Sequence, residues 1–381
     1  MRRILLCPSA FYPSLGGVEE ICRNLAAKLQ EKGFTVAIAV NRFPDALPET
    51  EEMEGVPVHR FFFKSPGRTL TGLAMGARIP GNIARFLKFV QSFEPDVIHV
   101  ICPSSNSLYC YVARMLLKKK LLVTLQGEFF MDANNFYDRS AFARYSASKL
   151  LNAADGVTAC SKYVLDDAKQ RFPFNSPIEE VLFNGVDLSE QLQSQDDLIL
   201  PNKFIFGLGR LVHNKGFDWL IKAFKRLSSL QPNVDLVLAG AGEAQAELNQ
   251  LCLTLAIEKR VHFVGRQARP AVTDLFRKCL FFVLPSPVEP FGIVCLEAMR
   301  AGKAVIATNT GGPPEFIQEG VNGLLVPPKD DEALFHAMSR LCSDEKLIKE
   351  LGKNGLEQVQ NFDWKQITDQ YIKLYSRLTS G

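Results

Sequence analysis

The sequence predicts an α/β protein made of two Rossmann-like domains in series, each built on a parallel β-sheet, with the two sheets facing a cleft between the domains. Its 381 residues exceed what one core usually takes and suit two domains. Short apolar runs alternate with amphipathic segments through most of the chain, and this alternation occurs twice, on either side of the polar stretch 188–202. Strands that alternate with helices indicate parallel, doubly wound sheets.

The first half begins with a buried strand, a Pro/Gly loop and an amphipathic helix. In this helix, Ile21, Leu25 and Leu29 repeat at i, i+4 spacing, and Gly33 stands at a helix-stop position. The expected strands of this half cover residues 2–7, 35–40, 96–101, 121–127 and 156–160. The expected helices cover residues 18–33, 106–119, 145–154 and 162–172. The stretch 178–187 closes the half.

The second half repeats this alternation after the stretch 188–202, which contains little to bury and is interpreted as a linker. The expected strands cover residues 203–209, 234–240, 261–265, 280–286, 304–309 and 323–328, and the expected helices cover 217–230, 244–255, 270–279, 291–302, 331–343, 345–360 and 364–378. Ligands of such sheets bind beyond the carboxyl ends of the strands, so the natural site is the cleft between the two halves.

Composition narrows the class of protein. A hydrophobic fraction of 47% and a charged fraction of 22% are those of an ordinary globular protein, and no apolar run approaches the length of a membrane-spanning helix. The nine cysteines form no C-x-x-C pair and lie mostly in apolar segments, which indicates free thiols in a reducing compartment. The apolar stretch at the start is too short for a signal peptide. We therefore expect a cytoplasmic protein, either free or peripheral at the inner face of a membrane.

The net charge of +3 is unevenly distributed. The window 59–120 holds ten basic residues against two acids, a net charge of +8. Such a window attracts an anionic acceptor or the anionic surface of a membrane, and it fits a solvated basic face equally well. Within it, the stretch 67–90 is basic and apolar and is interpreted either as an interfacial helix or as an ordinary helix packed on the sheet. Gly76, Pro80 and Gly81 argue against one long membrane helix.

A phosphate-binding loop is predicted at the first strand of the second half. In "FGLGRLVHNKG", the strand ends at a G-x-G that includes Gly209, and Arg210 and Lys215 follow. The glycines permit a tight turn close to a ligand, and the two cations suit a diphosphate. Gly16 and Gly17 form a second glycine loop before a helix, where free amides attract an anion. Alone, that second signal is weak.

A third loop, "PVEPFGIVCLEAM", carries two carboxylates eight positions apart, Glu289 and Glu297. A helix that begins near Phe291 or Gly292 leaves the amides of Gly292, Ile293 and Val294 unpaired and open to a phosphate. Since a carboxylate repels phosphate, the two acids are expected to accept hydrogen bonds from sugar hydroxyls on either side of a diphosphate. The spacing alone fits equally well a helix with one acid favoured by its dipole and a second, exposed acid.

These motifs resemble, in order and over nearly the whole chain, those of the retaining GT-B glycosyltransferases of family 4. The segments that carry the resemblance are "GGVEEICRNLAAKL", "PDVIHV", "NGVD", "GRLVHNKG", "LVLAGAGE", "VHFVG", "EPFGIVCLEAMRAGKAVIATNTGGPPEFI" and "NGLLVPP". Glu289 and Glu297 match the E-x7-E signature of the family. The resemblance implies an N-terminal acceptor-side domain at 1–187, a donor domain at 188–362, and a C-terminal helix at 363–381 that packs back on the first domain.

The resemblance also implies roles for the site residues. Arg210 and Lys215 would stabilise the leaving diphosphate, Glu289 would hold the donor sugar, and Glu297 would bind the ribose. The other donor-binding residues would be Gly16, Gly17, Gly209, Gly265, Phe291, Gly292, Ile293 and Val294. No metal or other cofactor is expected, in agreement with the lack of a D-x-D motif, and neither is a nucleic-acid partner.

One position departs from the family pattern. Relatives commonly keep a histidine at the strand end that reads "VTLQGEF" here, so Gln126 stands where that histidine would be. Glutamine can donate and accept hydrogen bonds, but it does not titrate. Glu128 and Asp132, close by, are candidates to bind the acceptor. His99, inside an apolar strand, is expected to be a core residue.

The sequence therefore predicts a retaining glycosyltransferase that moves a sugar from a UDP- or GDP-linked donor to a hydroxyl acceptor, in the synthesis of a cell-envelope glycan, a polysaccharide or a glycolipid. Two alternatives remain open. One is a nucleotide-sugar 2-epimerase of the same fold, and the other is a catalytically silent scaffold that binds sugar nucleotides.

Overall fold

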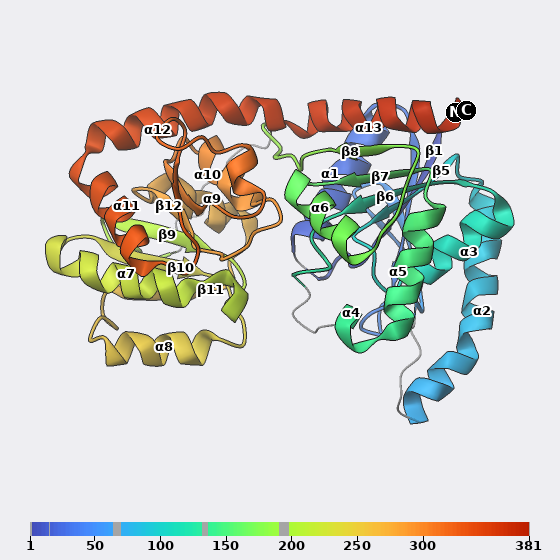
Figure 1. The fold of residues 1–381 in the computed structure, drawn as a ribbon, viewed down its shortest axis with the longest axis horizontal. Coiled ribbons are helices and arrows are strands. Elements are labelled where there is room, and N and C mark those ends of the chain that lie inside the picture. Colours follow the sequence, from blue (N-terminus) through green and yellow to red (C-terminus); the bar gives the residue numbers. More distant parts are fainter. Residues whose placement is uncertain (1, 15, 64–69, 132–135, 190–197, 381) are drawn as a thin grey trace. The chain divides into compact units, whose positions relative to one another are not determined.

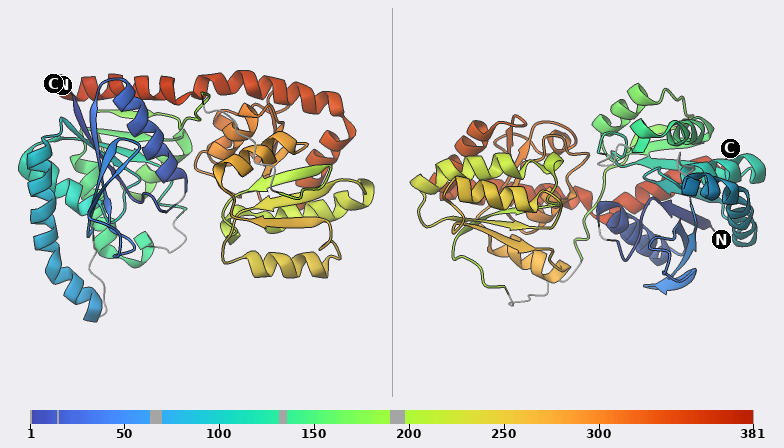
Figure 2. Two further views of the ribbon diagram at one scale, coloured as in Figure 1. Left: turned by 180° about the vertical axis from the view of Figure 1, so that it is seen from behind. Right: turned by 90° about the horizontal axis from the view of Figure 1, so that it is seen from below.

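The computed structural model describes residues 2–14, 16–63, 70–131, 136–189 and 198–380. The chain folds into two compact units, Met1–Asn184 with Trp364–Gly381, and Gly185–Asp363. Each unit has one β-sheet with helices on both faces (Figures 1 and 2). The prediction of two α/β domains with parallel sheets is confirmed.

The sheet of the first unit has the strand order β3-β4-β2-β1-β5-β6-β7-β8. Neighbouring strands run parallel except β3 and β4, which form an antiparallel pair at one edge. The strands are β1 (Arg3–Pro8), β2 (Thr35–Asn41), β3 (Thr50–Met53), β4 (Val56–Phe61), β5 (Val97–Ile101), β6 (Lys120–Leu125), β7 (Gly156–Ala159) and β8 (Glu179–Val181). Sequence reasoning missed β3 and β4, since both mix polar residues or proline with few apolar ones.

The helices of the first unit include the last helix of the chain. They are α1 (Gly17–Glu31), α2 (Leu70–Phe93), α3 (Ser107–Leu117), α4 (Phe136–Arg139), α5 (Ala141–Ala153), α6 (Lys162–Arg171) and α13 (Trp364–Thr379). Helix α13 packs on α1 and β5. Its Tyr375 hydroxyl lies 2.8 Å from Nδ1 of the buried His99, whose Nε2 lies 2.6 Å from the Thr124 hydroxyl. His99 is a core residue, as expected.

The sheet of the second unit has the order β11-β10-β9-β12-β13-β14, and all its paired strands are parallel. The strands are β9 (Phe204–Leu208), β10 (Asp235–Ala239), β11 (Val261–Gly265), β12 (Phe282–Leu284), β13 (Val305–Thr308) and β14 (Leu324–Val326). Its helices are η1 (His213–Lys215), α7 (Phe217–Leu230), α8 (Gln245–Thr254), α9 (Arg269–Lys278), α10 (Ile293–Arg300), η2 (Pro313–Glu315), α11 (Asp331–Ser343), α12 (Glu345–Gln358) and η3 (Val359–Phe362).

Apolar packing fixes the strand ends of the second unit. Helix α7 buries Leu220, Phe224 and Leu227, which share one helical face, in one apolar core with Ile205 of β9 and Leu238 of β10. Each such side chain contributes roughly 1.5–3 kcal/mol by leaving water. Figure 1 shows α7 on one side of this sheet and α9 and α10 on the other. The loops at the carboxyl edge of the sheet therefore start from a rigid base.

Two further expectations concern the thiols and the membrane. All nine cysteines are free, and seven of them are buried, as the sequence predicted. The stretch predicted as a helix near residues 67–90 forms the single helix α2, which contains Pro80; residues 64–69 lie outside the described part. Among the residues that the structure describes, no helix is both long enough and apolar enough to cross a membrane.

Candidate functional site

Two loops at the carboxyl edge of the second sheet carry Lys215 and Glu289. Lys215 ends η1, which follows β9, and Glu289 lies in the loop after β12, the strand next to β9. Nζ of Lys215 donates a hydrogen bond to Oε2 of Glu289 at 2.7 Å, and the two side chains are only 15% and 13% exposed. An ion pair this shielded from water is stronger than an exposed one, because solvent screens it less.

Close backbone contact holds these two loops together. Gly216, directly after Lys215, has a φ of +68°, and a Cβ atom there would lie 2.3 Å from the Pro285 carbonyl oxygen. Only glycine fits this approach, so the residue type at 216 brings the Lys215 loop onto the Glu289 loop. The Gly312 amide also donates to the Glu289 carbonyl oxygen at 2.8 Å. Backbone contacts between these loops therefore hold Lys215 and Glu289 close together.

Helix α10 begins beside Glu289. Its N-cap is Gly292, with a φ of +94° and no side-chain capping bond. The first N–H groups of a helix have no intrahelical partner, so those of Ile293 and Val294 can meet an anion. Phe291, predicted to bind the donor, is 2% exposed, and its ring packs on that of Phe316 with ring centroids 5.1 Å apart. Its side chain is therefore not available to a ligand.

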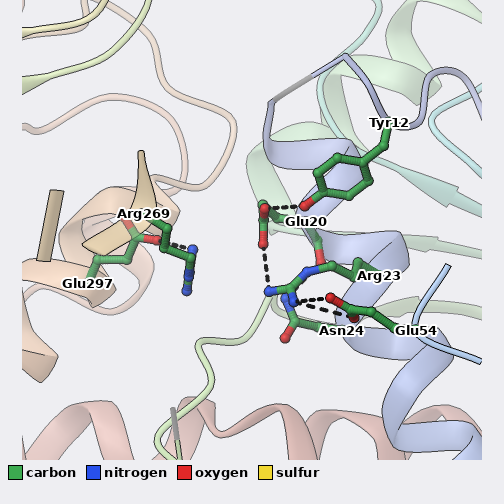
Figure 3. A network of polar contacts seen from close by, with 7 residues as sticks. All are labelled: Tyr12, Glu20, Arg23, Asn24, Glu54, Arg269 and Glu297. Atoms are coloured by element: carbon green, nitrogen blue, oxygen red, sulfur yellow. Dashed lines mark hydrogen bonds and ion pairs between the residues drawn. The ribbon is translucent and has the colours of Figure 1, made fainter. Parts of the chain in front are cut away.

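Glu297 lies farther along α10 and contacts a residue that sequence reasoning missed. Nη1 of Arg269, the first residue of α9, lies 3.3 Å from Oε1 of Glu297, and the side chains are 31% and 19% exposed (Figure 3). Both residues line a small cavity of about 30 Å³ together with Thr273, Phe276 and Arg300. Nothing local in the sequence marks Arg269, because the contact depends on how α9 and α10 pack.

The remaining residues predicted for the second unit stand at neighbouring strand ends. Arg210 follows β9 and has an exposed side chain. The Gly209 amide donates to the Ala239 carbonyl at 3.1 Å, and the Gly240 amide donates to the Gly265 carbonyl at 2.8 Å. These bonds tie the ends of β9, β10 and β11 together. The structure thus brings Lys215 to Glu289 and places Arg210, Gly209 and Gly265 on the same edge of the sheet.

In the first unit, Gly16 and Gly17 stand at the start of α1, as predicted, but acids already occupy this helix end. Gly16 is an extended N-cap without a side-chain capping bond, and a Cβ atom added to it would lie 2.9 Å from Oε2 of the buried Glu19. Glu20 pairs with Arg23 at 3.1 Å and accepts a hydrogen bond from the Tyr12 hydroxyl (Figure 3). An anion at this end would meet the Glu19 and Glu20 carboxylates as well as the free amides.

Gln126 and Glu128 follow β6, at the carboxyl edge of the first sheet. The Gln126 backbone N–H donates to Oε2 of Glu128 at 2.7 Å, and the Gln126 side chain pairs with that of Asn184. The Glu128 carboxyl group is enclosed, and its Oε1 has no hydrogen-bond partner among the described residues. Burial raises the pKa of Glu128 to about 8, although backbone N–H groups act in the opposite direction. Asp132 lies outside the described residues.

Ion pairs reduce the charge of the basic window. Arg60 pairs with Glu51 at 2.6 Å, Arg114 pairs with Asp155 at 2.9 Å, and Arg85 pairs with an acid outside the window as well, Glu49. The net charge counted along the sequence therefore overstates the positive charge of this surface. Within the described ranges, no group of three or more His, Cys, Asp or Glu residues is placed to hold a metal ion.

The comparisons with known proteins identify the class. The model described as "Glycosyltransferase Family 4" matches residues 15–190, and the model described as "Glycosyl transferases group 1" matches residues 190–358. The chain belongs to the family 4 glycosyltransferases, which have the GT-B fold, use nucleotide-sugar donors and retain the anomeric configuration.

Individual relatives extend over almost the whole chain. An uncharacterized glycosyltransferase of Methanocaldococcus jannaschii is 28% identical, with 98% of each chain covered. The N-acetyl-alpha-D-glucosaminyl L-malate synthase of Bacillus anthracis is 25% identical over 96% of this chain and 94% of its own. Among solved structures, Anabaena HepE in complex with UDP-glucose is 24% identical, with a TM-score of 0.77 over 99% of this chain and 100% of its own. That structure supports the fold.

Proposed function

We propose that this chain is a retaining hexosyltransferase that moves a sugar from a UDP- or GDP-linked donor to a hydroxyl group of a glycan, a lipid-linked sugar or a small molecule. The observation that carries the proposal is the Lys215–Glu289 pair beside the uncapped start of α10. This arrangement offers a cation and free amides for a diphosphate, and a carboxylate for hydroxyl groups, at one edge of one sheet.

Each group has a defined part in the proposed reaction. Lys215 and Arg210 bind the diphosphate and stabilise the charge that grows on it as the bond to the sugar C1 atom breaks. The amides of Ile293 and Val294 hold a phosphate oxygen at the helix start. Glu289 accepts hydrogen bonds from the sugar hydroxyls and steadies the positive charge that develops at C1, while Glu297 accepts from the ribose.

The first unit supplies the remaining proposed contacts. Gln126 hydrogen-bonds to the transferred sugar, and Glu128 and Asp132 bind the acceptor. Gly16 and Gly17 approach the donor diphosphate through their backbone. Arg78, Lys88 and Lys118 have exposed side chains, and they would attract an anionic acceptor or an anionic membrane surface in the cytoplasm.

The named relatives support a choice of substrates to test first. HepE was solved with UDP-glucose, which puts UDP-hexoses ahead of GDP-hexoses as donors. The Bacillus relative is named for the synthesis of a glucosaminyl malate, so small hydroxy acids belong among the acceptors beside glycans and lipid-linked sugars.

The proposal is tested by incubating the chain with a panel of UDP- and GDP-sugars, with and without these acceptors, and separating the products by mass and by anomeric NMR signals. The expected result is transfer or slow donor hydrolysis, with an α-linked donor giving an α-linked product. Release of an epimerised free sugar would instead indicate a 2-epimerase. Donor binding without turnover across the whole panel would indicate a silent scaffold.

A further inference from the structure

The carboxamide of Gln126 is locked to that of Asn184 by two hydrogen bonds of opposite sense. Nε2 of Gln126 donates to Oδ1 of Asn184 at 3.1 Å, and Nδ2 of Asn184 donates to Oε1 of Gln126 at 2.8 Å. Gln126 directly follows β6, while Asn184 follows β8 and is 3% exposed. The pair therefore joins two segments of the first unit that are 58 positions apart in the sequence.

This pairing makes the orientation of the Gln126 amide depend on that of the Asn184 amide. A carboxamide offers one N–H and one oxygen lone pair side by side, and a second carboxamide matches both at once. Rotating the Gln126 amide by half a turn would place N–H against N–H and oxygen against oxygen. After pairing, one N–H and one lone pair of Gln126 have no partner in the part of the chain that the structure describes, and their directions depend on Asn184.

The backbone of Gln126 is held as well. Its N–H donates to Oε2 of Glu128 at 2.7 Å, so the residue is anchored at the main chain and at the end of its side chain. A free glutamine side chain samples many rotamers, and ordering it opposes ligand binding. Here the ordering is completed during folding. Gln126 is thus prepared to contact a ligand in one orientation.

We propose that Asn184 is a positioning residue for Gln126: it orients the Gln126 carboxamide toward the transferred sugar without contacting the sugar itself. The inference rests on the proposed function, in which Gln126 binds the donor sugar. It goes further by naming a second residue on which that contact depends. A one-ångström error in the placement of such a contact can cost on the order of 100-fold in rate, so loss of Asn184 would act on turnover.

The test is a double-mutant cycle on the full chain, with the nucleotide sugar that the wild type turns over fastest. Gln126→Ala, Asn184→Ala and the double variant are compared by kcat and by donor KM, at a temperature where thermal melts show each to be folded. Asn184→Asp, which keeps the size but can only accept, serves if Asn184→Ala does not fold. The matched control is Asn322→Ala, since Asn322 is 5% exposed in the second unit and bonds to the Phe316 carbonyl at 3.0 Å.

The expected result is that Asn184→Ala and Gln126→Ala each lower kcat about 10- to 100-fold, and that the double variant falls no more than about twofold below Gln126→Ala. Asn322→Ala should lower the melting temperature but leave kcat and KM within about twofold. Two results would overturn this inference while leaving the proposed function intact. One is that Asn184→Ala and Asn184→Asp keep the wild-type kcat although Gln126→Ala is slow. The other is that the losses of the two single variants multiply in the double variant. A wild type that turns over no nucleotide sugar, or a fully active Gln126→Ala, would contradict the proposed function as well.

Discussion

Nζ of Lys215 lies 2.7 Å from Oε2 of Glu289, and both side chains are largely shielded from solvent. Lys215 is predicted to bind a diphosphate and Glu289 to bind a sugar, and in the structure the two side chains form an ion pair with each other. In the proposed function, a diphosphate bound at the start of α10 would compete for Lys215, and this would free the Glu289 carboxylate to accept hydrogen bonds from sugar hydroxyls.

The first prediction separates these two tasks. Lys215→Ala should raise the donor KM and lower kcat, since it removes a charge that binds both the ground state and the departing diphosphate. Glu289→Gln should mainly lower kcat, because the neutral amide cannot steady positive charge at C1. Losses of roughly 100- to 1,000-fold in kcat are typical when one such electrostatic contact is removed. Steady-state kinetics over a range of donor concentrations measures both parameters.

Lys349→Ala is the control for the lysine variant. Lys349 forms an exposed pair with Glu345 on α12, in which the side chains are 73% and 81% exposed, so its removal should leave the kinetics unchanged. If Lys215→Ala and Glu289→Gln both kept the wild-type rate and donor affinity, the assignment of the second unit's strand edge as the donor site would be wrong.

The second prediction concerns the start of α10. Gly292 has a φ of +94°, and Gly302, just beyond the other end of the same helix, has a φ of +68°. Replacing either glycine with alanine should destabilise the protein by about 1–2 kcal/mol, because a residue with a Cβ atom is strained at positive φ. Only Gly292→Ala should also weaken UDP or GDP binding, because it stands where the phosphate approaches. Thermal melts and titration calorimetry with the nucleotides measure the two effects, and equal affinity in both variants would contradict the phosphate site.

Local patterns explain why parts of the site could be predicted from the sequence. The apolar run before Pro285, the glycine at 292 and the helical period after it all lie within one short stretch, so the strand end and the start of α10 followed from neighbouring residues. The resemblance also implied that Phe291 binds the donor. The structure buries its side chain against Phe316 and Phe362, which come from later segments that no local pattern could connect to it.

Contacts between distant segments could not be predicted in the same way. Lys215 and Glu289 are 74 positions apart, and they meet because β9 and β12 are neighbours in the sheet. Alternation of strands and helices indicates a parallel sheet, but it does not state the strand order. Arg269 was missed for the same reason, since only the packing of α9 beside α10 brings it to Glu297.

The third prediction tests the ribose contact of Glu297. Glu297→Ala should weaken nucleotide-sugar binding about 10- to 100-fold, the usual value of a hydrogen bond to a charged acceptor. The wild type should bind 2′-deoxy or 3′-deoxy nucleoside diphosphates more weakly than the ribose forms, and Glu297→Ala should lose this discrimination. Equilibrium titrations with the three nucleotides measure the difference.

Glu332→Ala is the matched control, since Glu332 is an exposed acid on α11 whose loss should change neither affinity nor discrimination. Undiminished discrimination by Glu297→Ala would remove Glu297 from the ribose site.

The fourth prediction is a pH dependence of stability that arises from Glu128. Its pKa is raised to about 8 by burial, from an ordinary value of 4.5, so between these values the folded state holds a proton that the unfolded state lacks. The free energy of unfolding should therefore fall as the pH rises, by at most about 1.4 kcal/mol per unit. His99 acts in the opposite direction, because burial lowers its pKa from 6.5 to about 3, but its contribution changes only below about pH 6.5.

Urea unfolding at several pH values from 6.5 to 8 gives the slope in a range where His99 no longer contributes. Buried thiols such as those of Cys22 and Cys279, whose pKa burial also raises, lower the stability of wild type and variant alike near pH 8, so the comparison with a matched variant isolates Glu128. Glu128→Gln is the matched variant, since its neutral amide still accepts the hydrogen bond from the Gln126 backbone N–H and does not titrate. The wild-type stability should decline relative to that of Glu128→Gln as the pH rises through this range. Parallel curves for the two proteins would mean that Glu128 is already ionised in the folded state, and a buried neutral acid at the end of β6 would then be excluded.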